Sequence, residues 1–400
     1  MTLNAERLEV LLLVAAIVAM VARRLRLPYT VGLVLAGVGL AVFPLLHVPP
    51  LTKEMIFIIF LPPLIFEAAF HMRWAELRKD LGVVLVLATV GVVAAAACAV
   101  LGMRFLAGWS WSAALVFGVL ISATDPVSVI ATFKASGTEG RLRVLVEAES
   151  LFNDGTAAVL FGLALAVVSG QALTGGELVW GFLRMVVGGV LCGALVGGLV
   201  LLLVGRIHDH LVEITFTTVA AYGSFMVAEH FGLSGVLATL TAGVVVGNLG
   251  PLGALSERGR GAVEDFWEYA AFVANSLVFL LLGAQLAGRG LAEGWLPIVI
   301  AIGVVLVGRA VSVYGCSVLW RWSAWKISAR RQHLLFWGGL RGALALALAL
   351  GLPEDMANRS LVVTTAFGVV AFSVLVQGLT IAGPLKKEAG ASLPAPEAEG

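Results

Sequence analysis

Charged residues are scarce in this sequence. Only 13% of its 400 residues are Asp, Glu, Lys or Arg, whereas 60% are hydrophobic. A soluble domain of this size would carry about a quarter charged residues. The formal net charge of +1 gives no indication of nucleic-acid binding. The composition therefore excludes an ordinary soluble domain.

Several chemical signatures are also missing. The three cysteines, Cys98, Cys192 and Cys316, all lie within apolar runs, which favours small buried side chains over a disulfide or a metal site. The sequence has no P-loop and no run of His and Cys at metal-ligand spacing. No apolar run pairs a histidine convincingly with Ser, Cys or Asp, as an intramembrane hydrolase would require. We expect neither an enzyme nor a bound cofactor.

Long apolar runs recur from one end of the chain to the other. Because the backbone must satisfy its own hydrogen bonds in lipid, such runs predict an all-α polytopic membrane protein. We expect 13 transmembrane helices (spans 1 to 13), at residues 8–22, 29–46, 55–71, 81–106, 111–133, 143–169, 176–204, 211–230, 233–249, 265–287, 293–319, 331–351 and 358–384.

The distribution of Lys and Arg predicts the orientation in the plasma (inner) membrane. Of these 26 residues, 18 fall in the gaps after odd-numbered spans or in the tail, and 5 fall on the other side. Positive charge favours the cytoplasm. The N-terminus is therefore expected outside and the C-terminus in the cytoplasm.

The span count allows two inverted six-helix repeats. These would cover about 8–169 and 211–384, with a linker span at 176–204, inside a transmembrane transport domain of residues 1–385. A short, disordered cytoplasmic tail at 386–400 would follow. Span 5 is interrupted by Asp125-Pro126, and its counterpart, span 12, by Gly338-Gly339 and Gly342. Broken, crossing helices at matching positions point to a transporter site.

Three acids, Asp125, Glu149 and Asp154, lie inside apolar runs. A carboxylate at that depth costs roughly 2.5 kcal/mol or more, so each is a functional-site candidate. Ser150 and Asp154 share one helix face, four residues apart. A hard cation such as Na⁺ prefers oxygen ligands, and Asp154, Ser150 and a freed carbonyl near Thr124 would supply them. We expect Asp125 mainly to hold the break together by accepting backbone amides at a half-helix N-terminus, with direct ion contact a lesser role.

Competition at Asp154 would couple the cation to the proton. Burial disfavours the charged form of a carboxylate, so this group can hold either a proton or a cation but not both well. An acid at position 153 would allow a second proton, but Asn153 is neutral. The sequence therefore predicts electroneutral exchange of about one cation for one proton.

Two arginines, Arg309 and Arg341, also lie inside spans and need buried partners. We predict a structural ion pair between Glu149 and Arg309, oriented by Asn153. Arg341 would then compensate charge at the helix crossing or pair with another acid. The opposite assignment, Arg341 with Glu149, stays open. Glu67 in span 3 either lines a cytoplasmic funnel or is a simple interfacial acid.

These motifs resemble the monovalent cation:proton antiporter family, in its branch with an Asn-Asp pair. That branch includes archaeal and bacterial sodium/proton antiporters and animal sodium/hydrogen exchangers. The matching strings are Ala123-Thr-Asp-Pro126, Glu149-Ser-Leu-Phe-Asn-Asp154, Ala242-Gly-Val-Val-Val-Gly-Asn248, Arg309 and Gly338-Gly-Leu-Arg-Gly-Ala343. The resemblance implies a homodimer in the membrane lipid, with a six-helix ion-transport bundle beside a dimerisation domain in each protomer. It also implies ligation by the Thr124 backbone, Ser150 and Asp154.

The sequence thus predicts an antiporter that exchanges Na⁺, and also Li⁺, for H⁺ by alternating access. Potassium/proton exchange is the main alternative, because cavity size rather than ligand type separates Na⁺ from K⁺. A non-transporting ion sensor is a further alternative, for which a cytosolic output domain would be expected. A cation channel would need a continuous selectivity filter, and the sequence contains no such motif.

Overall fold

The computed structural model describes residues 5–25, 28–42, 49–125, 129–130, 133, 140–205, 209–250, 254–288, 294–323, 325–381 and 383. Pro126 and the expected tail at 386–400 lie outside these ranges. Within them the regular structure is helical, and the sole strand-like pairing is an isolated antiparallel bridge between Asp125 and Leu340. The prediction of an all-helical protein is confirmed.

Seven helices of the described chain are long and apolar enough to cross a membrane. Four of them are single elements: α8 (Arg141–Val168), α9 (Gly175–Val204), α10 (His210–His230) and α12 (Glu257–Ala287). The other three each contain a π-helical turn: α4 (Trp74–Val86) with α5 (Val92–Leu106), α13 (Trp295–Ala310) with α14 (Cys316–Leu319), and α17 (Arg359–Phe372) with α18 (Gly378–Thr380). This is a polytopic membrane protein.

The remaining described helices are shorter or less apolar. They are α1 (Ala5–Leu25), α2 (Tyr29–Val42), α3 (Leu61–Phe70, preceded by a π-helical turn at Met55–Phe60), α6 (Trp111–Leu120), α11 (Gly235–Leu249), α15 (Ala329–Gly338) and α16 (Ala343–Leu350). Each expected span meets helical residues, but α4 and α12 begin seven and eight residues before the expected starts at 81 and 265. Their first turns are charged, and they stay helical beyond the apolar run.

Hydroxyl side chains fix where several helices begin. The N-cap residues Ser110, Thr174, Ser234, Ser256 and Ser328 each accept a hydrogen bond from a backbone N–H of the first turn. Such a cap satisfies one of the donors that a helix start leaves open. Local sequence therefore helps to set where these helices begin.

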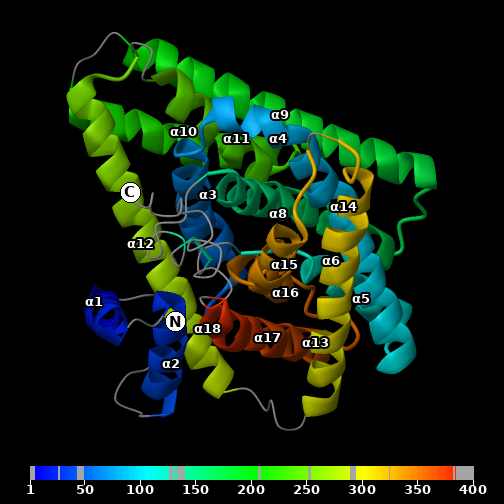
Figure 1. The fold of residues 1–400 in the computed structure, drawn as a ribbon. Helices are drawn as coiled ribbons and strands as arrows, with labels where there is room; N and C mark the ends of the chain where they lie inside the picture. Colours follow the sequence, from blue (N-terminus) through cyan, green and yellow to red (C-terminus); the bar gives the residue numbers. More distant parts are fainter. Residues whose placement is uncertain are drawn as a thin grey trace, which may run out of the picture.

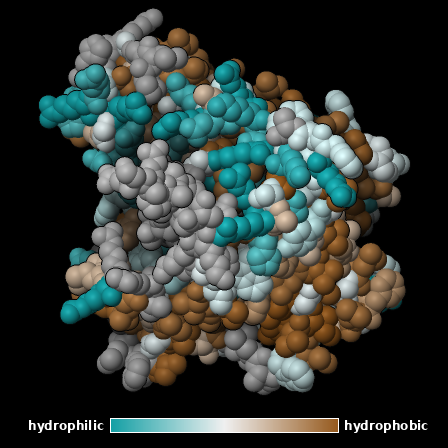
Figure 2. Space-filling model, in the orientation of Figure 1, coloured by the Kyte–Doolittle hydropathy of each residue, from teal (hydrophilic) through white to brown (hydrophobic). Residues whose placement is uncertain are grey.

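The helices pack as two groups. The scaffold group comprises α1–α3 and α9–α12, where α12 packs on α2, α3 and α10, and α11 packs on α9 and α3. The crossing group comprises α4–α6, α8 and α13–α18, where α5 packs on α6 and α13, and α8 packs on α4 and α6. Figure 1 shows α9 and α12 along the edges, with α8, α15 and α16 near the centre. In Figure 2 hydrophobic residues cover the lower part of the visible face, and hydrophilic residues gather above them.

Two glycines set the closest approach within the scaffold group. A Cβ on Gly37 of α2 would meet the carbonyl oxygen of Leu280, and a Cβ on Gly283 of α12 would meet the carbonyl oxygen of Val34. The two backbones are therefore in direct contact, which only glycine allows. Gly39, also on α2, has open space at the same position.

We predict that Gly283→Ala lowers the stability of the protein by about 1–3 kcal/mol, because the two backbones must separate to admit the methyl group. Gly39→Ala should be neutral or slightly stabilising, since alanine favours the helix. Thermal unfolding in detergent compares the two variants. Equal melting temperatures would contradict the close contact.

Candidate functional site

Two interrupted helices meet inside the crossing group. Helix α6 ends at Leu120, and the chain stays non-helical to Asp125; α15 ends at Gly338, and α16 starts at Ala343. The backbone N–H of Asp125 donates to the carbonyl oxygen of Leu340 at 2.7 Å. The predicted breaks at Asp125 and at Gly338–Gly342 are confirmed, and they are joined to each other.

The break after α6 leaves three carbonyl oxygens that no helix uses. Arg341 Nη1 donates to the carbonyls of Ser122 and Ala123, at 2.9 and 3.0 Å. Ser150 Oγ donates to the third, that of Thr124, at 2.5 Å. Arg341 is thus a buried cation at the C-terminal end of α6, where the helix dipole favours positive charge.

Arg341 thus lies at the helix crossing, and its compensation of charge there stays a prediction. It forms no salt bridge with any acid in the described part of the chain. Its own backbone N–H donates to Ser373 Oγ at 2.8 Å, and that hydroxyl donates to Gln377 Oε1 at 2.7 Å. Side chains between α17 and α18 thus form hydrogen bonds that hold the second break in place.

Glu149 and Arg309 form a buried, bidentate ion pair. Arg309 Nη1 lies 2.7 Å from Glu149 Oε1, and Nη2 lies 3.0 Å from Oε2, with the two residues only 4% and 2% exposed. Arg309 Nη2 also donates to the carbonyl of Leu335 at 2.8 Å. The structure forms this predicted pair and not the alternative with Arg341. It joins α8 to α13 and to α15.

Asn153 differs from the prediction. We expected it to orient the Glu149–Arg309 pair, but its amide nitrogen donates to Thr124 Oγ1 at 2.9 Å. Asn153 lies one helical turn beyond Glu149, where α8 faces the first break rather than α13. Its amide oxygen is buried and has no hydrogen-bond partner among the described residues.

Asp125 lies where the sequence argument expected it, beside a half-helix N-terminus. A Cβ on Gly342, the residue before α16, would meet the Asp125 carboxylate. Negative charge is favoured at that position by the helix dipole. The absence of a side chain at Gly342 is what lets the carboxylate approach.

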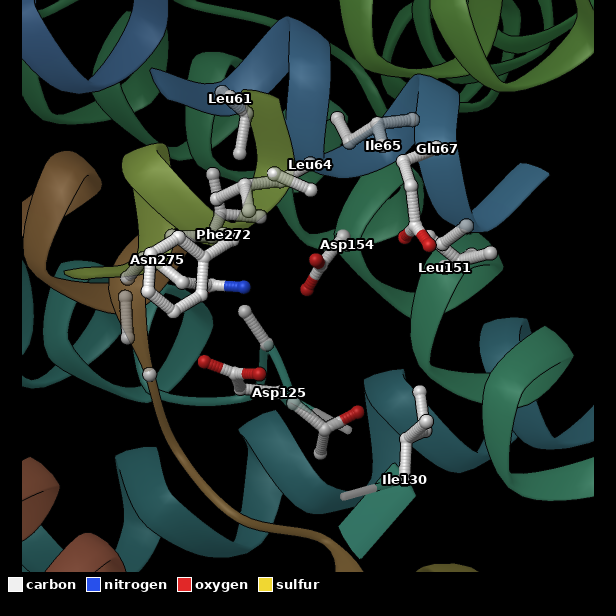
Figure 3. Close-up of a pocket in the computed structure, with 18 of the residues that line it drawn as sticks. Leu61, Leu64, Ile65, Glu67, Asp125, Ile130, Leu151, Asp154, Phe272 and Asn275 are labelled. Atoms are coloured by element: carbon white, nitrogen blue, oxygen red, sulfur yellow. The ribbon is translucent and has the colours of Figure 1, made fainter. Parts of the chain in front are cut away.

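A cavity of about 270 Å³ lies between the scaffold and crossing groups. Figure 3 shows the carboxylates of Asp154 and Asp125 and the amide of Asn275 directed into this space. Asp154 Oδ1 is buried and has no hydrogen-bond partner within the described chain. Glu67 and Glu268 also line the cavity, and its described lining includes no Lys or Arg.

Sequence reasoning missed several of these side chains. Glu268 and Asn275 of α12 line the cavity, as does Tyr29, whose hydroxyl hydrogen-bonds Ser276. Each of these polar side chains lies in an expected apolar span, and that position could have marked it as a candidate. Glu67, for which two roles stayed open, lines the cavity.

Comparisons with known proteins fit this geometry. The family model for the transmembrane part of sodium/hydrogen exchangers matches residues 10–387. The chain belongs to the sodium/hydrogen exchanger family. This is a family of transporters and not of enzymes, and the resemblance inferred from the motifs is confirmed.

Individual members of the family resemble the chain over nearly its whole length. It is 41% identical to the Na⁺/H⁺ antiporter ApNhaP of Aphanothece halophytica, covering 90% of this chain and 70% of that one. It is 36% identical to the Na⁺/H⁺ antiporter NhaH of Halobacillus dabanensis, covering 95% and 97%. The fold matches that of the sodium proton antiporter MjNhaP1 from Methanocaldococcus jannaschii with a TM-score of 0.75, at 18% identity and 96% coverage of both chains.

We predict that Glu149→Gln and Arg309→Gln each lower stability by about 3–5 kcal/mol, because each leaves one buried charge without a partner. The double variant should lose less than the sum of the two single losses. Thermal or denaturant unfolding in detergent provides the three values.

The matched control is the exposed pair of Arg260 with Glu264, at 2.9 Å. Arg260→Gln should cost no more than about 1 kcal/mol, since solvent screens that pair. Additive losses at Glu149 and Arg309 would mean that the buried pair contributes no coupling.

Proposed function

We propose that this protein is a secondary active antiporter that exchanges Na⁺, and also Li⁺, for H⁺ across the plasma membrane. The observation that carries the proposal is the buried Asp154 carboxylate, with one oxygen that has no partner among the described residues, in a cavity between two helix groups. The relatives named Na⁺/H⁺ antiporters support the choice of ions.

The cation ligands would be the Thr124 carbonyl, Ser150 Oγ and Asp154. The other two carbonyls at the break are held by the guanidinium of Arg341, a fixed cation. The Thr124 carbonyl is instead held by the Ser150 hydroxyl, which can rotate. When the hydroxyl hydrogen turns away, the Thr124 carbonyl oxygen and Ser150 Oγ can both coordinate Na⁺. Asp125, at the N-terminus of α16, adds negative charge to the same cavity.

The stoichiometry follows from the surrounding charges. Glu149 is neutralised by Arg309 and Asn153 is uncharged, so Asp154 is the remaining carboxylate on this part of α8. One carboxylate carries either one proton or one monovalent cation. We infer electroneutral exchange of one Na⁺ for one H⁺.

The architecture that we propose has 13 transmembrane helices in two inverted repeats, 8–169 and 211–384, joined by span 176–204. The single transport domain would cover residues 1–385, with residues 386–400 as its cytoplasmic tail. The N-terminus would lie outside, the C-terminus in the cytoplasm, and two copies would form a homodimer. The broken helices at matching places in the two halves support this arrangement.

Alternating access would arise from movement of the crossing group against the scaffold group. The cavity has one wall in each group, so their relative displacement changes its exposure. Glu67 lies near the end of α3, and Glu268 lies in the N-terminal half of α12; both ends lie on the predicted cytoplasmic side. We infer from these two acids that the cavity opens toward the cytoplasmic side in an inward-facing state.

We predict that an inward Na⁺ or Li⁺ gradient drives proton efflux from proteoliposomes that contain the purified protein. Asp154→Asn should abolish this flux, because the amide can exchange neither ion. Asp265→Asn is the matched control, since Asp265 is exposed on α12 outside the cavity lining, and it should retain activity. Flux driven only by K⁺ would contradict the choice of Na⁺, and full activity of Asp154→Asn would exclude it as the carrier.

A second prediction concerns the membrane potential. One-for-one exchange moves no net charge, so a potential imposed with valinomycin and K⁺ should leave the equilibrium Na⁺ and H⁺ gradients unchanged. The null-point pH measures this equilibrium. A null point that moves with the potential would show that more than one proton crosses per Na⁺.

A further inference from the structure

The segment that follows α14 combines tryptophan with positive charge. We call residues 320–331 the Trp–Arg segment. It contains no acid, but it contains three tryptophans and four basic residues: Trp320, Trp322, Trp325, Arg321, Lys326, Arg330 and Arg331. It links α14 to α15 across the upper right of Figure 1. It falls in a gap that the charge distribution assigns to the cytoplasm.

Two rings and two charges near the start of this segment are exposed. Trp322 is 91% exposed, and the Arg321 guanidinium lies 5.6 Å from the centre of its ring. Trp325 is also exposed, at 43%. Indole rings favour the boundary between lipid and water, where an apolar ring and a polar N–H are both satisfied. An exposed ring at the end of a membrane-crossing helix therefore fits the headgroup region.

Two charges of this segment, Arg321 and Lys326, have no acidic partner among the described residues. Both residues are exposed. By contrast Arg73, Arg141, Arg143 and Arg260, elsewhere in the charged loops and helix ends, each pair with a carboxylate. The charges of Arg321 and Lys326 are thus available to an external anion.

We propose that the Trp–Arg segment binds the phosphate headgroup of an anionic phospholipid in the surrounding membrane. Arg321 and Lys326 would contact the phosphate, and Trp322 would insert at the level of the glycerol backbone. Basic residues near a membrane surface are attracted to anionic lipids, and arginine donates well to phosphate oxygens. We choose a membrane lipid as the occupant because exposed indole rings and basic side chains lie together, and a phospholipid offers both an apolar part and a phosphate.

The segment is fastened to the helix that carries Ser150 and Asp154. Arg141, the first residue of α8, donates to the carbonyls of Trp325 and Lys326 at 3.0 and 3.1 Å and pairs with Asp80 at 2.6 Å. The Trp325 indole donates to the carbonyl of Lys79 on α4. If the proposed function holds, a lipid bound here restrains the crossing group and changes the exchange rate.

The test measures lipid binding without transport. The purified protein in detergent is titrated with phosphatidylglycerol or phosphatidylcholine, and bound lipid is counted by native mass spectrometry. Phosphatidylglycerol should bind more tightly, and the R321Q/K326Q variant should lose roughly thirtyfold in its affinity, since each basic residue contributes a factor of about five. The R78Q/R258Q variant, which removes two exposed charges elsewhere, should bind like the parent protein.

Three results would overturn the proposal: equal binding of the two lipids, an unchanged affinity in R321Q/K326Q, or an equal loss in R78Q/R258Q. Displacement of phosphatidylglycerol by inorganic phosphate at similar concentration would assign the site to a free anion instead. Size-exclusion profiles before titration establish that the variants are folded.

Quenching by brominated phosphatidylglycerol provides a second readout in proteoliposomes. The Trp322→Phe variant should lose a quenched component of the fluorescence, while Trp267→Phe, which removes a tryptophan buried inside the protein, should keep it. Identical quenching in both variants would contradict the placement of Trp322. Exchange is then compared in the two lipids: no exchange in either would refute the proposed function and leave the binding result standing.

Discussion

The structure depends on satisfying the backbone where two helices are interrupted inside the membrane. Lipid offers no hydrogen bonds, so each open carbonyl or amide that does not face the cavity needs a protein partner. The bridge from Asp125 to Leu340 joins the two breaks directly. Arg341 crosses from the second break to cap carbonyls of the first, and the Asp125 carboxylate lies beside the start of α16. Each interrupted helix thus completes the other, and the site can exist only where they cross.

The groups at the crossing fall into two sets, those held by charge-assisted contacts and those with few hydrogen-bond partners. Arg341, Arg309 and Glu149 are held by short charge-assisted contacts that keep the crossing and α8 in place. Ser150, the Thr124 carbonyl and Asp154 are held only by a hydroxyl hydrogen bond or by no described partner. Oxygens with few hydrogen-bond partners, surrounded by charged side chains held in place, suit a site that must bind and release ions.

Much of the site could be predicted because its signals are strong over short distances. Acids in apolar runs, helix breaks and the i, i+4 spacing on α8 led to the oxygen ligands that we propose, and the need to neutralise Arg309 led to its observed partner, Glu149. The partner of Asn153 could not be predicted, since it depends on which face of α8 meets Thr124. The starts of α4 and α12 were misplaced because hydropathy marks the apolar run and not the end of helical hydrogen bonding. Ser373 and Gln377 form hydrogen bonds with a distant span, and Asn275 lines a cavity shared with distant spans, neither of which local sequence reveals.

The central claim is that Na⁺ and H⁺ compete for one carboxylate. Calorimetric titration of the purified protein with NaCl, in buffers of different ionisation enthalpy at a pH where the carboxylate is protonated, counts the protons released as Na⁺ binds. Competition at Asp154 predicts one proton released for each Na⁺ bound, and neither binding nor release in Asp154→Asn. Binding of Na⁺ without proton release, or with two protons released, would contradict it.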